Sequence, residues 1–147
     1  MNVIIYDTNF GNTRKVAEAL AASLGDDTRC VSVADVTATD LQCDLLIVGC
    51  PINAWRPTPK INELLGNLSP GQLSGVRAAA FDTRVDSILS GNAARKIAHM
   101  LSNAGASIIT APKGFIVTGK EGPLAGGELD KVAEWAKAIK KLMVEKV

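Results

Sequence analysis

Apolar residues follow two different periods along this chain. Five short apolar runs show no polar alternation, which is typical of strands that are covered on both faces of a sheet. We therefore predict strands at residues 3–6, 30–33, 44–49, 76–81 and 107–117. The last of these regions is interrupted by Pro112 and Gly114.

Between these runs the apolar spacing changes to three and four residues, which predicts helices. Gly25 and Gly105 stand where the first and third helices should end, Thr58 suits the N-cap of the second helix, and Pro59 suits its first helical position. Segment 35–42 is too short and polar to predict a helix, so the second connection is left open. The helical stripes comprise Val16, Leu20 and Leu24; Ile61, Leu64, Leu65 and Leu68; Ala94, Ile97, Ala98 and Leu101; and Leu129, Val132, Ala136, Ile139 and Met143.

Strands that alternate with helices predict an α/β fold with three layers, in which a doubly wound parallel sheet is covered on both faces. The length of 147 residues corresponds to one domain, residues 1–147. For a five-stranded order of 2-1-3-4-5, a ligand binds beyond the carboxyl ends of strands one and three, where the winding reverses. The loops at that point, residues 7–13 and 50–57, are also the richest in Asn, Thr, Gly and Pro.

Composition narrows the possible functions. The chain is 47% hydrophobic and 21% charged, which excludes disorder, and its formal charge of +1 gives no net field for nucleic acid or an anionic membrane. Three cysteines without a C-x-x-C motif and a single histidine, His99, exclude a zinc site and a disulfide scaffold. With no apolar run near 20 residues and no signal-like start, we expect a cytoplasmic protein with reduced thiols, no metal and no membrane partner.

The loop after the first strand is rich in groups that bind a phosphate. Thr8, Asn9, Asn12 and Thr13 offer hydroxyl and amide donors, and Gly11 lets the backbone approach closely. The following helix adds free backbone N–H groups and the positive end of its dipole. An alternative is that Asn12 or Thr13 only caps the helix. The motifs G-x-G-x-x-G and G-x-x-x-x-G-K-[ST] are both missing, which disfavours an NAD-type Rossmann domain and a nucleotide triphosphatase.

The run T-N-F-G-N-T after the first strand resembles the phosphate loop of flavodoxins, whose usual form is [ST]-x-T-G-N-T. The segments G-C-P-I-N-A-W-R-P-T-P, F-D-T-R and G-K-E-G-P-L also resemble a group of flavodoxin family proteins. The resemblance covers the whole chain and implies a short-chain, flavodoxin-like fold that binds FMN and transfers electrons. It implies three loops around FMN, comprising Thr8, Asn9, Phe10, Gly11, Asn12 and Thr13; Pro51, Ile52, Asn53, Ala54 and Trp55; and Asp82, Thr83, Arg84 and Gly91.

The chain departs from the flavodoxin pattern in its aromatic residues. Phe10 replaces a usual hydroxyl, which predicts weaker phosphate binding and a ring near the pocket mouth. Trp55 is the candidate for one wall of the flavin site, with a rim residue packed on Pro57 as the alternative. Segment 82–91 has no aromatic residue, so Ile88 or Leu89 would have to cover the other face of the flavin.

Two arginines fall in the loops that would flank the flavin. If Arg56 and Arg84 lie near the ring, their charge predicts a higher redox potential than in flavodoxins with acidic sites. The alternative is that both are loop charges, paired with Asp82 or Asp86.

Three further residues are predicted to be structural or superficial. We expect Trp135 to pack in the last helix, Cys50 to be a buried packing residue, and His99 to lie on the polar face of its helix.

Three functions remain open. The first is an FMN-dependent redox carrier with no catalytic side chain. The second is a flavodoxin-like NAD(P)H:quinone or flavin oxidoreductase, and the third is a binding module that no longer holds flavin. The expected partner is a redox protein or a small quinone-like acceptor. The charge of +1 counts against docking through the acidic surface that carrier flavodoxins show to basic partners.

Overall fold

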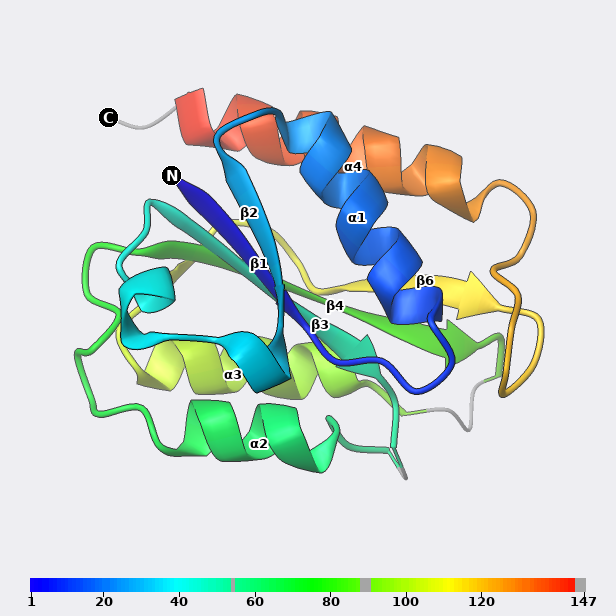
Figure 1. Ribbon diagram of the computed structural model, residues 1–147, viewed down its shortest axis with the longest axis horizontal. Coiled ribbons are helices and arrows are strands. Elements are labelled where there is room, and N and C mark those ends of the chain that lie inside the picture. The colour runs from blue at the N-terminus through cyan, green and yellow to red at the C-terminus, as the bar shows by residue number, and fades with distance from the viewer. Residues whose placement is uncertain (54, 88–90, 145–147) are drawn as a thin grey trace.

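The computed structural model describes residues 1–53, 55–87 and 91–144 (Figure 1). Its parallel sheet has the order β2-β1-β3-β4-β5, with β6 also paired to β4, which confirms the predicted α/β class and winding. The strands are β1 Asn2–Tyr6, β2 Thr28–Ser32, β3 Leu45–Pro51, β4 Arg77–Val85, β5 Ser107–Ile108 and β6 Lys113–Val117.

The helices form two layers around this sheet. In Figure 1, α1 and α4 lie on one face of the sheet and α2 and α3 on the other. The connection that the sequence leaves open holds two short 3-10 helices, Val33–Asp35 and Ala38–Leu41. The α-helices are α1 Asn12–Leu24, α2 Pro59–Gly66, α3 Ala93–Asn103 and α4 Glu128–Val144.

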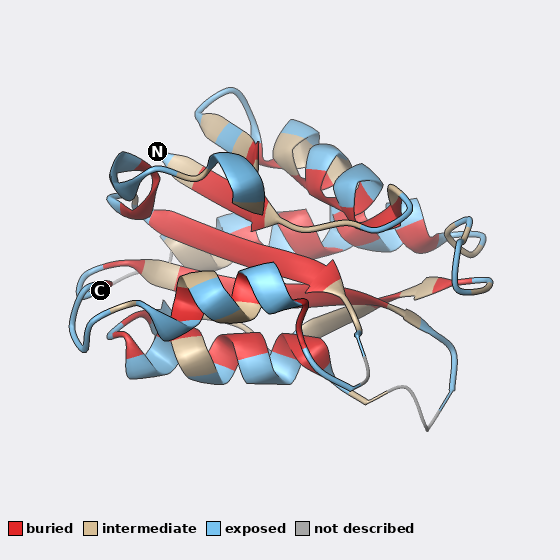
Figure 2. Ribbon diagram, turned by 60° about the horizontal axis from the view of Figure 1, so that its bottom comes forward, coloured by how far each residue is buried: buried red, intermediate tan, exposed pale blue. Residues whose placement is uncertain are grey.

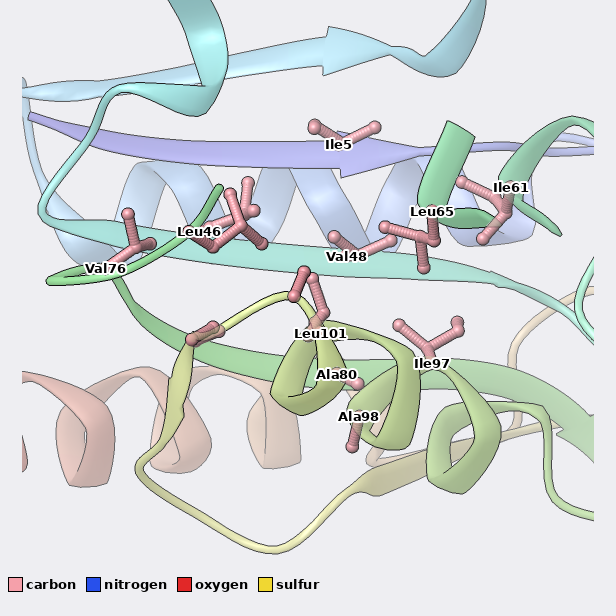
Figure 3. Packing of buried hydrophobic residues seen from close by; sticks show 14 of the residues in the cluster. Ile5, Leu46, Val48, Ile61, Leu65, Val76, Ala80, Ile97, Ala98 and Leu101 are labelled. Carbon is pink, nitrogen blue, oxygen red and sulfur yellow. The ribbon is translucent and has the colours of Figure 1, made fainter. Parts of the chain in front are cut away.

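The central strand β3 supplies both hydrophobic cores. Successive side chains of a strand point to opposite faces, so Leu46 and Val48 pack toward α2 and α3, whereas Leu45 and Ile47 pack toward α1 and α4. Figure 3 shows Leu46 and Val48 facing Leu101 of α3. In Figure 2 the buried residues follow the sheet and the inner faces of the helices.

Three aromatic rings anchor the core under α1 and α4. Phe81, Phe115 and Trp135 contact one another edge to face, with ring centroids 5.8 to 6.1 Å apart. This confirms the predicted packing role of Trp135. Gly49 is required beside them, because a Cβ atom at that position would collide with the ring of Phe81.

The last predicted strand region is in fact two strands. Proline cannot donate to a strand ladder, and residues around Pro112 leave the sheet between β5 and β6. β5 pairs with the beginning of β4, and β6 pairs with its end, from Phe81 to Val85. The carboxyl end of β6 therefore reaches the edge of the sheet where the predicted ligand loops gather.

Two details of the predicted helices are corrected. The sequence pattern places Leu129 in the apolar stripe of α4, yet Leu129 is 51% exposed, and Glu128 is buried in its place. Glu128 faces β6 because its carboxylate accepts a 2.6 Å hydrogen bond from the N–H of Ile116. Thr58 and Pro59 do stand at the N-cap and first position of α2, but the Thr58 side chain makes no capping bond to the described residues.

Glu128 should make the protein sensitive to acid. Burial alone raises the pKa of Glu128, but the Lys131 ammonium, 2.8 Å away, and the Ile116 N–H outweigh it and lower the pKa. A lowered folded pKa stabilises the fold above the unfolded value of about 4.3, and this stability is lost as pH falls through the folded pKa. We expect Glu128→Gln to lose less stability than the parent between neutral and acidic pH, measured by urea denaturation. Glu134→Gln, exposed on the same helix, is the control and should behave like the parent.

Candidate functional site

A cleft opens at the carboxyl ends of the strands, where the winding of the sheet reverses. Its volume is about 340 Å³, and loops that follow β1, β3, β4 and β6 contribute its walls. The lining residues are Thr8, Asn9, Phe10, Asn12, Thr13, Pro51, Ile52, Asn53, Trp55, Thr83, Arg84, Val85, Val117 and Lys120.

The loop between β1 and α1 leaves the beginning of α1 open toward this cleft. Gly11 is the N-cap residue and adopts a left-handed conformation, with φ of 91°. Thr8 shapes the turn, because its hydroxyl accepts a 2.9 Å hydrogen bond from the Gly11 N–H. Among the described residues no side chain caps α1, so the N–H groups of its first turn remain available to an anion.

Asn12 and Thr13 do not cap α1, so that alternative is wrong. The Asn12 amide donates to the carbonyl of Glu121 at 3.1 Å, which ties the loop to the segment after β6. The Thr13 hydroxyl lies 2.8 Å from the hydroxyl of Thr83, and both side chains are buried. Because one hydroxyl of this pair donates to the other, the pair has one O–H left to donate elsewhere.

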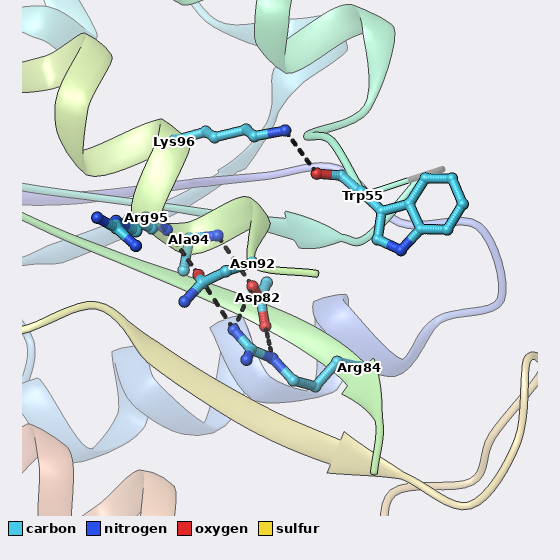
Figure 4. A network of polar contacts seen from close by, with 7 residues as sticks. All are labelled: Trp55, Asp82, Arg84, Asn92, Ala94, Arg95 and Lys96. Carbon is cyan, nitrogen blue, oxygen red and sulfur yellow. Dashed lines mark hydrogen bonds and ion pairs between the residues drawn. The ribbon is translucent and has the colours of Figure 1, made fainter. Parts of the chain in front are cut away.

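The loop after β3 turns sharply at the rim of the cleft. Asn53 and Arg56 exchange backbone hydrogen bonds of 2.7 and 3.0 Å, and Trp55 between them has φ of 66°. The Lys96 ammonium donates to the Trp55 carbonyl at 2.8 Å (Figure 4). The Trp55 side chain is 60% exposed and lies against Gly91, where a Cβ atom would come within 2.6 Å of the indole.

Asp82 and Arg84 form a buried ion pair below the cleft. Arg84 bonds both oxygens of the Asp82 carboxylate at 2.7 Å, and the N–H of Ala94 donates to the same carboxylate at 2.9 Å (Figure 4). Asp82 is fully buried and Arg84 is 22% exposed. The alternative that pairs Arg84 with Asp82 is therefore confirmed, and the Arg84 charge is neutralised close by.

Three predicted site residues are described but do not line the cleft. Gly11 shapes the loop, Asp82 is turned toward Arg84 and α3, and Gly91 supports Trp55. Ala54, Ile88 and Leu89 lie outside the described residues.

Sequence reasoning missed three lining residues. Val85, Val117 and Lys120 line the cleft because β6 continues beside the end of β4. The segment G-K-E-G-P-L, which resembles the flavodoxin family, contains Lys120. The position of Lys120 at the cleft depends on the pairing of β6 with β4, which the sequence does not indicate.

The three cysteine thiols are not ionised at neutral pH. Burial raises the pKa of Cys50 to about 12 and the pKa values of Cys30 and Cys43 to about 11, so none is a reactive thiolate at neutral pH. Cys50 is buried and His99 is exposed, as predicted. Within residues 1–53, 55–87 and 91–144, no cluster of potential metal ligands occurs and no helix is long and apolar enough to cross a membrane.

An uncapped helix beginning at the reversal point of a doubly wound sheet is the arrangement with which such α/β proteins bind phosphate-bearing ligands. A model of the Flavodoxin family matches residues 4–135, and the chain belongs to that family. It is 36% identical over 90 residues to a flavodoxin from Aquifex aeolicus (strain VF5), an alignment that covers 55% of this chain. The chain thus spans about half of that relative, 48% of its length.

Solved structures agree on the fold. A flavodoxin from the domain Archaea superposes with a TM-score of 0.80 at 18% identity, over 98% of this chain and 99% of the other. Flavodoxin 2 from Bacillus cereus, in its oxidised form, gives a TM-score of 0.81 at 18% identity, over 95% of this chain and 97% of the other. At such identities, these likenesses concern the architecture alone.

Proposed function

We propose that this protein is an FMN-binding electron carrier whose cleft holds the cofactor with its phosphate on the loop between β1 and α1. The observation that carries the proposal is the uncapped beginning of α1 behind the left-handed Gly11. Its N–H groups and dipole suit a dianionic phosphate without help from a lysine or arginine. The hydroxyls of Thr8 and Thr13 supply further donors at the same place.

The rest of the cleft fits a flat, largely apolar ring. Phe10, Ile52, Val85 and Val117 give it apolar walls, and Trp55 stands at its rim. Among the described lining residues there is no Asp, Glu, His or Cys. The chain therefore offers no obvious general acid or base in the cleft, and bound FMN would supply the electron-transfer chemistry.

An assay of turnover separates a carrier from an oxidoreductase. The FMN-loaded protein should not oxidise NADPH with a quinone acceptor by itself, but it should pass electrons when a flavodoxin reductase is added. Rapid NADPH oxidation without the reductase would contradict the carrier function and favour the NAD(P)H:quinone oxidoreductase.

The charge nearest the cofactor site should set its redox potential. Arg84 is neutralised by Asp82, and Arg56 does not line the cleft. Lys120 does line it, and no salt bridge is found for Lys120 among the described residues. A cation beside the ring favours the added electron.

We expect Lys120→Gln to lower the midpoint potential of bound FMN by an amount on the order of 20–50 mV. Spectroscopic redox titration measures the shift. The control Lys137→Gln removes an exposed charge on α4, far from the cleft, and should leave the potential unchanged. An unchanged or raised potential in Lys120→Gln would show that the Lys120 charge does not stabilise reduced FMN.

A further inference from the structure

A second hollow lies beside the cofactor cleft, along α3 and the beginning of α2. Its volume is about 890 Å³, and it is a broad surface depression, open to solvent, and not an enclosed small-molecule cavity. Trp55 lines both this hollow and the cleft. Anything that occupies the hollow therefore contacts the residue at the rim of the proposed flavin site.

The charges around this hollow have one sign. The positively charged Arg56, Arg95 and Lys96 line it together with His99, and no Asp or Glu is found among its described lining residues. We call this hollow, with these four residues, the basic groove. Helix α3 itself has no carboxylate along its length, although the whole chain has 16 basic against 15 acidic residues. The nearby Asp82 does not offset the groove, because it is buried and bonded to Arg84.

Helix α4, on the opposite face of the sheet from α3, carries both positive and negative side chains. On α4 the cation of Lys131 pairs with Glu128, and Asp130 and Glu134 stand among the remaining lysines. In the basic groove, the partner found for Lys96 among the described residues is a backbone carbonyl, that of Trp55, which leaves its charge uncompensated. Positive charge in the groove is therefore not offset by a carboxylate among its described lining residues.

The basic groove also has apolar lining residues, Pro57, Ala98, Met100 and Ile108. A surface that combines apolar and charged side chains is typical of a protein–protein interface. Complementary charge on such a surface accelerates and orients the encounter of two proteins.

We propose that the basic groove is the docking surface for an acidic redox protein, which it seats against Trp55. The proposal rests on the carrier function above, since a carrier must bring a partner to the rim of its cofactor site. Three of the sixteen Lys and Arg residues of the chain, Arg56, Arg95 and Lys96, line this groove, and no acidic residue is found among its described lining residues.

A titration with a redox-silent probe tests the docking surface directly. The FMN-loaded, 15N-labelled protein is titrated with a zinc-substituted rubredoxin of strongly acidic composition, and amide shifts are followed by NMR. We expect shifts concentrated at Arg56, Arg95 and Lys96. The affinity should fall steeply between about 10 and about 100 mM salt, as the Debye length shortens from about 30 to about 10 Å.

Charge-reversal variants distinguish an effect of the basic groove on binding from an effect of the net charge of the protein. Arg95 is exposed, so Arg95→Glu should lower the affinity for the rubredoxin probe about fivefold or more, an effect of the size of one exposed ion pair. Lys137→Glu makes the same charge change on α4 and should have no more than a small effect. Equal losses in both variants, shifts centred on α4, or no salt-dependent binding would overturn the proposal. The visible spectrum of each sample reports its FMN content, so a failure of flavin binding, which concerns the proposed function, is distinguished from a failure of docking.

Discussion

Replacing Thr13 by Val should lower the affinity for FMN about 10- to 100-fold. Thr13 is buried at the beginning of α1, and its hydroxyl shares one hydrogen-bond donor with Thr83 inside the cleft. A hydrogen bond to a charged group contributes about 1.5–3 kcal/mol, and Val keeps the shape of Thr while removing the hydroxyl. Quenching of flavin fluorescence measures the dissociation constant of each variant.

Riboflavin makes this prediction specific, because it carries the ring of FMN but no phosphate. Its affinity should be the same for Thr13→Val and the parent. Thr28→Val is the matched control, since Thr28 lies at the amino end of β2, at the other end of the sheet from the cleft. If Thr13→Val weakens the binding of FMN and of riboflavin equally, Thr13 acts on folding or on the flavin ring. This result would contradict a role for Thr13 in binding the phosphate.

Replacing Arg84 by Met should cost about 2–3 kcal/mol of folding free energy. The substitution leaves the fully buried Asp82 carboxylate without its cation, which is costly in a protein interior. The estimate is reduced because Arg84 itself is 22% exposed. Urea denaturation of the apoprotein measures the loss without any contribution from cofactor binding.

Two further variants test whether the pair is the cause. Arg14→Met breaks an exposed ion pair with Glu18 on α1 and should leave the denaturation midpoint unchanged. Asp82→Asn combined with Arg84→Met removes the buried charge, while the oxygen of the introduced amide can still accept from the N–H of Ala94. The double variant should therefore recover part of the stability lost in Arg84→Met. A double variant less stable than Arg84→Met would show that desolvation of Asp82 is not the source of the loss.

The architecture was largely predictable because its signals are local. The unbroken apolar run of β3 predicts a central strand, and the spacing of Val16, Leu20 and Leu24 predicts α1. The position of the cleft followed from the topology, since the loops after β1 and β3 meet where the winding reverses. The split between β5 and β6 was less accessible, because it depends on which part of β4 each strand pairs with.

The details of the site depended on contacts distant in sequence. Asn12 is held by Glu121, 109 residues away, and no local pattern indicates that bond. Asp82 is a residue type that could bind a ligand in this loop. Its carboxylate instead accepts hydrogen bonds from Arg84 and from an N–H group at the beginning of α3. Local sequence patterns indicate which residues lie in loops, whereas the direction of a side chain is decided by its tertiary neighbours.

We infer that the loop between β1 and α1 holds the phosphate of FMN. Isothermal titration of the purified apoprotein with FMN and, separately, with riboflavin tests it most directly. We expect saturable binding of a single FMN per chain, at least about tenfold tighter than riboflavin, because only FMN carries a phosphate that reaches the N–H groups of α1. Failure to bind FMN, or equal affinity for FMN and riboflavin, would contradict it.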